Sequence, residues 1–276
     1  MAVAREVQNR TNAVFIPPFD HPDIILGQGT MALELEEQYE EIVAGQPGLS
    51  VHSSRNGNGY PTVPALASTP KQRTGSGHAG PGLDAVIAPL GGGGMLAGIA
   101  TALAPTRTLV FGAEPSFQGG DDGARGLAQG QRIEEVKTLT IADGLRTPVG
   151  KLNWEVVSDR EKVAGVYAVS EAQIRRAMRL VMERLKVVVE PSAVVGVAVA
   201  MFDEGFRRRC ERDGGWDLGV VLSGGNVGMD ALGELLAGDR EGEERDGKCK
   251  DEGSELERDL GLMGMDGEKD VENVLG

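Results

Sequence analysis

The sequence predicts an α/β fold of three layers, in which helices cover both faces of a parallel sheet. Apolar runs of strand length alternate with helical patterns, the element order that builds a parallel sheet with right-handed crossovers. The run Leu218–Leu222 is almost wholly apolar, as expected of a parallel strand covered on both faces. Glycine clusters follow two of the strands, and in such sheets ligands bind at the carboxyl ends of the strands.

In the first third of the chain, the pattern predicts a short strand and one helix. The strand is Ala13–Ile16, which precedes a Pro-Pro turn. The helix is Met31–Val43, with Thr30 as its N-cap. Glu34 and Glu36 would then lie near the positive end of the helix dipole.

The middle of the chain predicts three further strands and a helix. The helix, Met95–Leu103, is rich in small residues and follows a run of four glycines. The strands are Asp84–Pro89, Thr108–Ala113 and Val163–Val169. Together with Leu218–Leu222 they supply the predicted sheet.

The next segment predicts two helices. Ser170 and Gln173 form a capping box, in which each side chain bonds the backbone N–H of the other residue. The helix after it presents one apolar face at helical spacing, which favours core packing: Ile174, Ala177, Met178, Val181, Met182 and Leu185. Pro191 suits the first turn of a second helix that runs through Ala193–Phe206.

Composition excludes several classes of protein. The 276 residues carry a formal net charge of −14, which disfavours general binding of nucleic acid or of an anionic membrane surface, since both require clustered Lys and Arg. Two cysteines cannot build a disulfide framework, so a reducing compartment is expected. The start lacks an apolar signal segment, and the longest apolar stretch is too short for a membrane helix. We therefore expect a soluble cytoplasmic protein.

Three regions differ in composition. Residues 12–237 carry the α/β pattern. Within them, residues 50–81 are rich in Ser, Gly and Pro and contain no Asp or Glu, which indicates a low-complexity insertion. Residues 238–276 carry most of the negative charge and predict an acidic disordered tail.

The glycine-rich junctions are the strongest candidates for a ligand site. The consecutive glycines Gly91, Gly92, Gly93 and Gly94 let several N–H groups point at one anion at a helix N-terminus, so a phosphate is expected there. A tight turn without a ligand remains the alternative. Ser223 opens the second junction, where its hydroxyl suits a ligand ring nitrogen, although Ser-Gly-Gly is also ordinary turn chemistry.

Carboxylates follow the third predicted strand, Thr108–Ala113. Glu114 comes directly after it, and Asp121 and Asp122 come a few residues later. Carboxylates beside a backbone carbonyl suit Mg²⁺ or Ca²⁺, and solvated loop carboxylates are the alternative. The three histidines form no metal or nucleophile pattern.

Seven segments stand in a distinctive order along the chain: Phe15–Pro22, Gly27–Thr30, Pro89–Gly94, Gly112–Pro115, Thr140–Gly144, Glu183–Pro191 and Ser223–Asn226. This series resembles a known family, the pyridoxal-phosphate (PLP) enzymes of the serine racemase and threonine/serine dehydratase group. The likeness covers about residues 12–237 except 50–81, with serine racemases the closer match. The resemblance implies the large domain of the tryptophan synthase beta-like fold, with the small domain mostly missing.

The resemblance also implies roles for individual residues. Gly91–Gly94 would hold the cofactor phosphate, with Met95 closing the turn. Ser223 would meet the pyridine nitrogen, and Glu190 would lie close to the ring. Mg²⁺ or Ca²⁺ would bind Glu114, the Gly120 carbonyl and Asp122. Lys186 and Asn226 correspond to positions near a nucleotide-effector site.

One family segment has no counterpart here. The family carries a Ser-x-Lys-x-Arg-Gly-like segment, upstream of the position of Val14, whose lysine binds the cofactor covalently. Ser68–Gly75 echoes it only faintly, because Lys71 lies in the insertion and Pro70 breaks the pattern. No catalytic lysine is therefore assigned, and we expect an N-terminally truncated chain that is inactive alone.

Three interpretations stay open. The first is an incomplete racemase or ammonia-lyase acting at Cα of L-serine or L-threonine, with racemase and dehydratase not distinguished. The second is a non-catalytic PLP- and cation-binding relative that forms a homodimer or pairs with a full-length homologue. The third is a truncated product that folds poorly, because less apolar surface is buried.

Overall fold

The computed structural model describes residues 2–44, 82–212 and 215–237. The chain divides into two units, Met1–Val227 and Gly228–Gly276, and the described part of the second is a helix over residues 229–237. The predicted insertion, the predicted acidic tail and the Lys71 segment lie outside the described residues.

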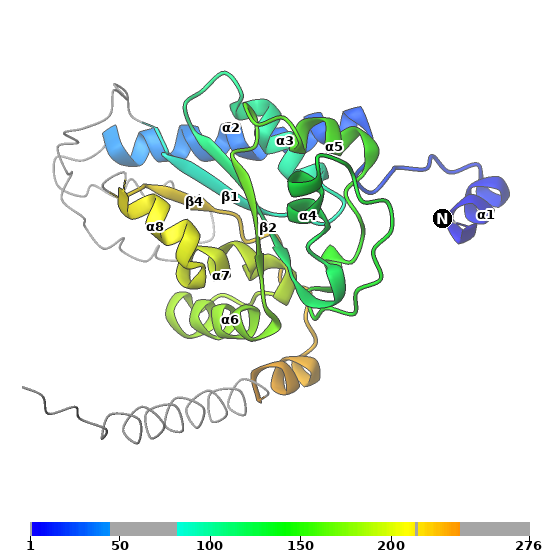
Figure 1. The fold of residues 1–276 in the computed structure, drawn as a ribbon. Coiled ribbons are helices and arrows are strands. Elements are labelled where there is room, and N and C mark those ends of the chain that lie inside the picture. Colours follow the sequence, from blue (N-terminus) through cyan, green and yellow to red (C-terminus); the bar gives the residue numbers. More distant parts are fainter. Residues whose placement is uncertain (1, 45–81, 213–214, 238–276) are drawn as a thin grey trace, which may run out of the picture. The chain divides into compact units, whose positions relative to one another are not determined.

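In the described part of the first unit, four strands form a parallel sheet, as the sequence predicts (Figure 1). The strands stand in the order β3-β2-β1-β4, so β1 lies between β2 and β4. Their bounds are β1 Ala85–Pro89, β2 Leu109–Pro115, β3 Gly165–Val169 and β4 Leu218–Val220. β1 and β2 are buried along almost their whole length, which explains their apolar sequence.

Helices cover both faces of the sheet (Figure 1). On one face lie α2 (Pro22–Ala44), α3 (Gly94–Leu103) and α5 (Lys151–Val157). On the other lie α6 (Glu171–Leu185), α7 (Val195–Phe202) and α8 (Glu204–Arg212). The remaining elements are α1 (Ala2–Thr11), α4 (Asp122–Gln129) and the 3-10 turns η1 (Phe117–Gly119), η2 (Asp143–Leu145) and η3 (Pro191–Val194).

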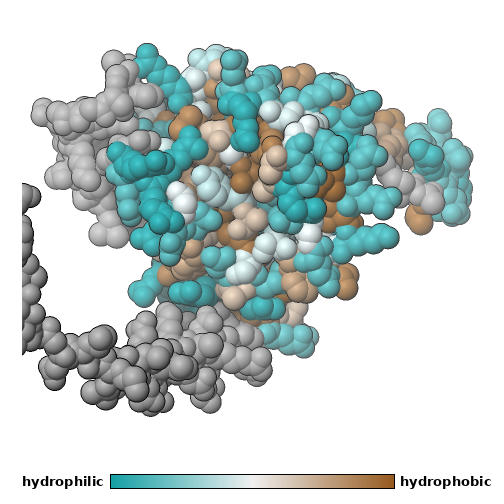
Figure 2. Space-filling view, viewed as in Figure 1, coloured by the Kyte–Doolittle hydropathy of each residue, from teal (hydrophilic) through white to brown (hydrophobic). Residues whose placement is uncertain are grey.

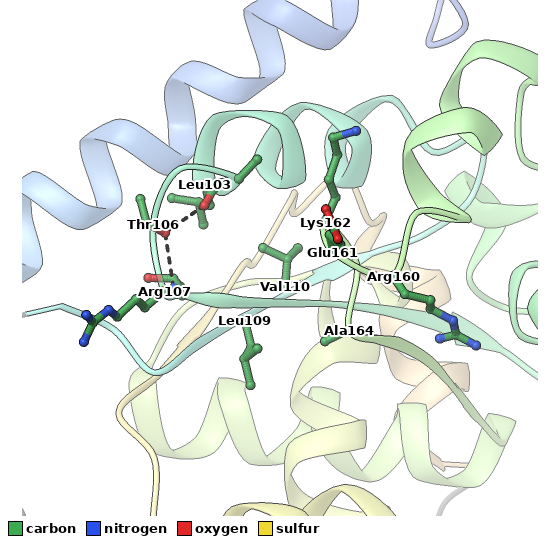
Figure 3. Close-up of a pocket in the computed structure, with 11 residues that line it drawn as sticks. Leu103, Thr106, Arg107, Leu109, Val110, Arg160, Glu161, Lys162 and Ala164 are labelled. Atoms are coloured by element: carbon green, nitrogen blue, oxygen red, sulfur yellow. Dashed lines mark hydrogen bonds between the residues drawn. The ribbon is translucent and has the colours of Figure 1, made fainter. Parts of the chain in front are cut away.

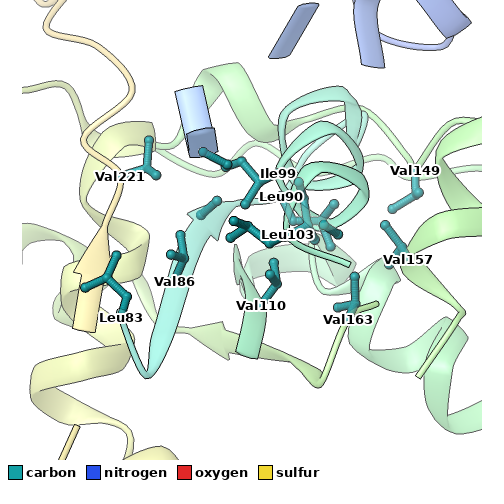
Figure 4. Packing of buried hydrophobic residues seen from close by; sticks show 14 residues of the cluster. Leu83, Val86, Leu90, Ile99, Leu103, Val110, Val149, Val157, Val163 and Val221 are labelled. Atoms are coloured by element: carbon teal, nitrogen blue, oxygen red, sulfur yellow. The ribbon is translucent and has the colours of Figure 1, made fainter. Parts of the chain in front are cut away.

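Each face of the sheet has its own apolar core. Figure 4 shows Val86 and Val110 packed with Ile99 and Leu103 of α3 and with Val157 of α5. On the opposite face the Phe111 ring stacks on Trp216, with ring centroids 5.8 Å apart, and meets Phe206 edge-on at 5.3 Å. Alternate side chains of β1 and β2 thus serve both cores, as the pleat of a strand requires.

Other apolar side chains stay exposed on the first unit. Leu26, Leu33 and Ile42 of α2 are more than half exposed. The face drawn in Figure 2 shows hydrophobic patches among hydrophilic residues. Across the described residues, no helix combines the length and the apolar character needed to cross a bilayer.

Two predictions for the first third of the chain are wrong. Ala13–Ile16 is not a strand: Val14 and Ile16 are 86% and 71% exposed and lie beside no neighbouring strand among the described residues. The helix begins at Pro22 rather than Met31, because the His21 carbonyl already accepts the N–H groups of Ile24 and Ile25. Thr30 is therefore not an N-cap but lies inside α2, where its hydroxyl donates to the Gly27 carbonyl, and Glu34 and Glu36 lie mid-helix.

Close packing against α3, rather than a turn, explains why Gly29 of α2 is a glycine. A Cβ on Gly29 would lie 2.8 Å from the carbonyl oxygen of Gly98 in α3. A Cβ on Gly98 would lie 2.5 Å from the carbonyl oxygen of Ile25. The two helices therefore approach at facing glycines, a spacing that side chains would prevent.

The later helices are confirmed with corrections at their ends. Ser170 caps α6 with the predicted capping box, and Ile174, Ala177, Met178 and Val181 are buried. Leu185, however, is 58% exposed. The helix predicted after Pro191 is divided into η3, α7 and α8, and Asp203 between the last two has an extended backbone. β4 is only half-buried because no other described strand pairs with its outer side, so its apolar sequence overstated its burial.

Candidate functional site

The glycine run Gly91–Gly94 connects β1 to the N-terminus of α3, and all four residues are buried. Gly93 has φ +90°, a left-handed conformation that favours glycine. Among the described residues, no hydrogen bond uses the N–H groups of these four glycines. Buried N–H groups without an acceptor are rare in proteins, so a row of them at a helix N-terminus is chemically suited to an anion.

The chain itself covers part of this loop. A Cβ on Gly92 would lie 2.3 Å from the Phe19 ring, and one on Gly91 would lie 2.9 Å from the Cα of Leu145. A Cβ on Gly93 would lie 3.0 Å from the Cβ of Asn153. The glycines are thus required by close packing, while their N–H groups remain unused.

Ser223 and Glu190 lie beside each other near the same edge of the sheet. The Glu190 N–H donates to the Gly224 carbonyl at 3.1 Å, and the Glu190 carboxylate accepts the Asn226 N–H at 2.9 Å. Ser223 is exposed and follows β4. The backbone after β4 is therefore fixed to Glu190, and the Ser223 hydroxyl remains accessible.

The glycine loop and Ser223 stand where the connections of the sheet diverge. From β1 the chain crosses over α3 to β2, whereas β4 pairs with the opposite side of β1. This is the switch point at which open α/β sheets bind ligands, outside the carboxyl ends of the strands. Ser192 lies two residues after Glu190, and its hydroxyl accepts the Gly144 N–H at 3.0 Å. Because Gly144 lies next to Gly91, this bond links the Glu190 segment to the glycine loop.

Glu114, at the end of β2, is fully buried. Its carboxylate accepts the N–H groups of Gly123 and Ala124 at 3.1 and 2.7 Å, so it caps the N-terminus of α4. Burial raises the pKa of Glu114 well above its usual value, and the charge of nearby Asp122 adds to that rise.

Asp122 is the second buried carboxylate, 3% exposed, and it accepts the Val149 N–H at 3.0 Å. Burial raises its pKa from 3.8 to about 6. Gly120, the third predicted ligand, is buried just before it and donates its N–H to the Phe117 carbonyl. Within residues 2–44, 82–212 and 215–237, no three His, Cys, Asp or Glu side chains gather to hold a metal, so a cation here depends on backbone oxygens as well.

The sequence of this region matches a family model described as "Pyridoxal-phosphate dependent enzyme", over residues 73–224. That match includes the glycine loop, both buried carboxylates, Glu190 and Ser223. The chain belongs to this family of pyridoxal-phosphate dependent enzymes.

Individual proteins similar to this chain support the same family assignment. The chain is 34% identical over 237 residues to a serine racemase of Oryza sativa subsp. indica, covering 85% of this chain and 56% of the relative. It is 33% identical to an L-threo-3-hydroxyaspartate ammonia-lyase of Saccharomyces cerevisiae, covering 87% and 59%. The structure of maize serine racemase superposes with a TM-score of 0.64 at 33% identity, covering 86% and 60%. The chain thus spans a little over half the length of these relatives.

The predicted PLP-family effector residues are both exposed. Lys186 ends α6 in a left-handed conformation, φ 60°, and its Nζ donates to the Glu183 carbonyl. The backbone N–H of Asn226 donates to the Glu190 carboxylate, and its side chain remains available to a ligand.

A small pocket of about 80 Å³ lies at the opposite end of β2 from Glu114 and the glycine loop (Figure 3). Figure 3 shows the charged ends of Arg107, Arg160 and Lys162 pointing away from one another. They do not converge on a common anion, and none of the predicted site residues lines the pocket.

Two residues beside the glycine loop of this PLP-family chain were not singled out by the sequence analysis. The Asp20 carboxylate accepts the N–H groups of Lys151, Leu152 and Asn153 at 3.0, 2.9 and 3.3 Å, and so caps α5 from far along the chain. The Asn153 side chain donates to the Gly92 carbonyl at 2.6 Å. Both are long-range contacts to backbone atoms, for which a single sequence carries no signal.

Proposed function

We propose that this chain binds PLP at the carboxyl ends of β1 and β4 and forms part of an enzyme acting at Cα of a hydroxy amino acid. The reaction class is that of a serine racemase or of an L-serine or L-threonine ammonia-lyase. The observation that carries the proposal is the row of buried, unused N–H groups at Gly91–Gly94, located at the switch point of the sheet.

Each residue has a distinct part in this proposal. The glycine N–H groups and the positive end of α3 bind the cofactor phosphate, with Met95 in the first turn. The Ser223 hydroxyl meets the ring nitrogen, and Glu190 lies close to the ring while fixing the backbone after β4. When bound, PLP draws electrons from the Cα–H bond of the amino-acid substrate and so makes that proton more acidic.

We further propose that the 276-residue chain is inactive alone. The lysine segment of the family has no counterpart at the expected place in this sequence. Loss of a group that binds covalently and moves a proton removes several orders of magnitude in rate. Binding of the cofactor would then rest on the phosphate contacts.

Equilibrium titration of the purified chain with PLP, followed by absorption and fluorescence, tests both parts. We expect saturable binding that inorganic phosphate weakens, and no pyruvate or D-serine from L-serine. Absence of PLP binding would refute the cofactor proposal, whereas turnover of L-serine would refute the proposed inactivity.

We also propose that Mg²⁺ or Ca²⁺ binds Glu114, Asp122 and the Gly120 carbonyl. Two buried carboxylates with raised pKa values repel each other, and a divalent cation removes that repulsion. Either cation should then raise the unfolding temperature of the wild type and leave that of Glu114→Gln unchanged. An equal rise in both proteins would assign the cation to another place.

We also propose that a nucleotide effector binds near Lys186 and Asn226. Lys186→Ala should weaken binding of a nucleotide triphosphate in a direct titration while leaving PLP binding unchanged. The reducing, cytoplasmic location proposed here rests on the two cysteines of the chain, which suit no disulfide framework.

A second candidate function is a non-catalytic relative that forms a homodimer or pairs with a full-length homologue. The exposed Leu26, Leu33 and Ile42 of α2 favour it, because a partner would cover them. Light scattering and co-purification with an intact homologue test it, with Leu33→Lys as the disrupting variant. A monomer that never associates would argue against it.

A further inference from the structure

Asn153, the third residue of α5, is a fully buried amide beside the glycine loop. Its Nδ2 lies 2.6 Å from the carbonyl oxygen of Gly92 and 3.4 Å from that of Phe19. Its Oδ1 is buried and has no hydrogen-bond partner among the described residues.

The orientation of this amide follows from its neighbours. Both nearby atoms are carbonyl oxygens, which accept and never donate, so the NH₂ end must face them. The Oδ1 is then left unpaired, which costs free energy in a buried position. An amide at this position therefore has an unfavourable term, which its hydrogen bond to the Gly92 carbonyl must offset.

That contact fixes one peptide of the loop. The Gly92 carbonyl also accepts the Gly150 N–H at 2.9 Å, so two donors hold it toward the start of α5. The peptide bonds of the described residues are all trans, and in a trans peptide the N–H points opposite to the C=O. The Gly93 N–H is therefore directed away from α5, where no described group accepts it.

The start of α5 is itself held in place. The Asp20 carboxylate accepts three successive N–H groups there, and a Cβ on Gly150 would lie 2.4 Å from Asp20 Oδ1. The donors to Gly92 therefore stand on a fixed support rather than on a free loop.

We infer that Asn153 is a positioning residue that holds the Gly92–Gly93 peptide so that the Gly93 N–H is aimed at the phosphate of bound PLP. Asn153 acts through this peptide and need not touch the cofactor. The inference rests on the proposed function, and it adds a residue outside the glycine loop to the phosphate site.

The test compares affinities for PLP and for pyridoxal, which lacks the phosphate, in the full 276-residue chain. We expect the wild type to prefer PLP. In Asn153→Ala and Asn153→Leu the affinity for PLP should fall about tenfold, as expected for one lost hydrogen bond, while that for pyridoxal stays unchanged. Asn153→Leu nearly keeps the size of the side chain but carries no hydrogen-bond donor.

Val157→Ala is the matched control, because Val157 is equally buried in the same helix but contacts the apolar core. It should lower the unfolding temperature and leave the ratio of the two affinities unchanged. Equal losses for PLP and pyridoxal in the Asn153 variants, or the same ratio as the wild type, would overturn the inference. A wild type without any preference for PLP would instead refute the proposed function.

A second measurement does not depend on the stability of the variants. In the wild type, the backbone N–H resonance of Gly93 should shift on titration with inorganic phosphate. A Gly93 resonance that phosphate leaves unchanged, while those of Gly91 or Gly94 move, would show that this N–H is not aimed at the anion.

Discussion

Because α2 and α3 approach closely, we predict opposite effects on stability for alanine substitutions at two glycines of α2. Gly27 and Gly29 both lie inside α2, and neither has a positive φ. A Cβ on Gly27 would meet nothing within 4 Å, whereas one on Gly29 would lie 2.8 Å from the Gly98 carbonyl oxygen and 3.4 Å from the Ala102 Cβ. Alanine should therefore stabilise the first position and destabilise the second.

The magnitude follows from two terms. Replacing glycine by alanine in a helix interior stabilises by about 0.5–1 kcal/mol, and this term is common to both variants. Forcing a methyl group into a closely packed contact costs about 1–3 kcal/mol, and this term applies only to Gly29→Ala. The difference between the two free energies of unfolding should therefore be about 1–3 kcal/mol.

Urea unfolding followed by circular dichroism measures that difference, and each kcal/mol corresponds to about 2–4 °C in unfolding temperature for a domain of this size. Gly98→Ala should behave like Gly29→Ala, because its Cβ would lie 2.5 and 2.7 Å from backbone atoms of α2. Equal stabilisation by Gly27→Ala and Gly29→Ala would refute the close crossing of the two helices.

Three further predictions concern side chains that hold backbone N–H groups or buried charge. The pKa of Asp122 is raised from 3.8 to about 6, so the stability contributed by the protonated carboxyl is complete below pH 3.8 and is lost as pH rises through about 6. Asp122→Asn should therefore raise the free energy of unfolding by about 3 kcal/mol at pH 7, measured without divalent cations. If the variant does not change the slope of this free energy against pH between pH 4 and 6, the prediction is contradicted. Ser170→Ala should destabilise by about 1 kcal/mol through loss of the α6 cap, and Gln173→Ala added to it should cost less than it does in the wild type, as a double-mutant cycle would measure. Asp20→Ala leaves three N–H groups of α5 without their acceptor and should speed hydrogen exchange at Leu152, whereas Asp20→Asn, which keeps one oxygen, should have a smaller effect.

The sequence predicted the sheet well because its strands are buried and continuous in apolar character. β1 and β2 appear as runs of Val, Ile, Ala and Phe, and the capping box of Ser170 is a local signal that does not depend on the rest of the fold. The start of α2 was misplaced for the opposite reason. Gly27 and Gly29 are read locally as turn residues, and only the partner helix, some 70 residues later, explains why one of them is glycine.

Part of the candidate site could likewise be predicted from the sequence, and part could not. The unused N–H groups of Gly91–Gly94 could be anticipated, because consecutive glycines between a strand and a helix have few other uses. That the Glu114 carboxylate would cap α4 could not be anticipated, since the same residue was equally consistent with a solvated loop. Burial decided between these readings, and burial is a property of the whole fold.

One short backbone segment, Val149 and Gly150, links the buried Asp122 carboxylate to the glycine loop Gly91–Gly94. Asp122 accepts the N–H of Val149, and the next residue, Gly150, donates to the Gly92 carbonyl. Asp122 Oδ2 thus holds the peptide that directly precedes the one whose N–H, together with Asn153, fixes the Gly92 carbonyl. A cation that favours the ionised carboxylate strengthens its acceptance of the Val149 N–H, because charged acceptors form the stronger hydrogen bonds. Cation binding at β2 and phosphate binding after β1 should therefore be mutually favourable, and by reciprocity each ligand should raise the affinity for the other by the same factor.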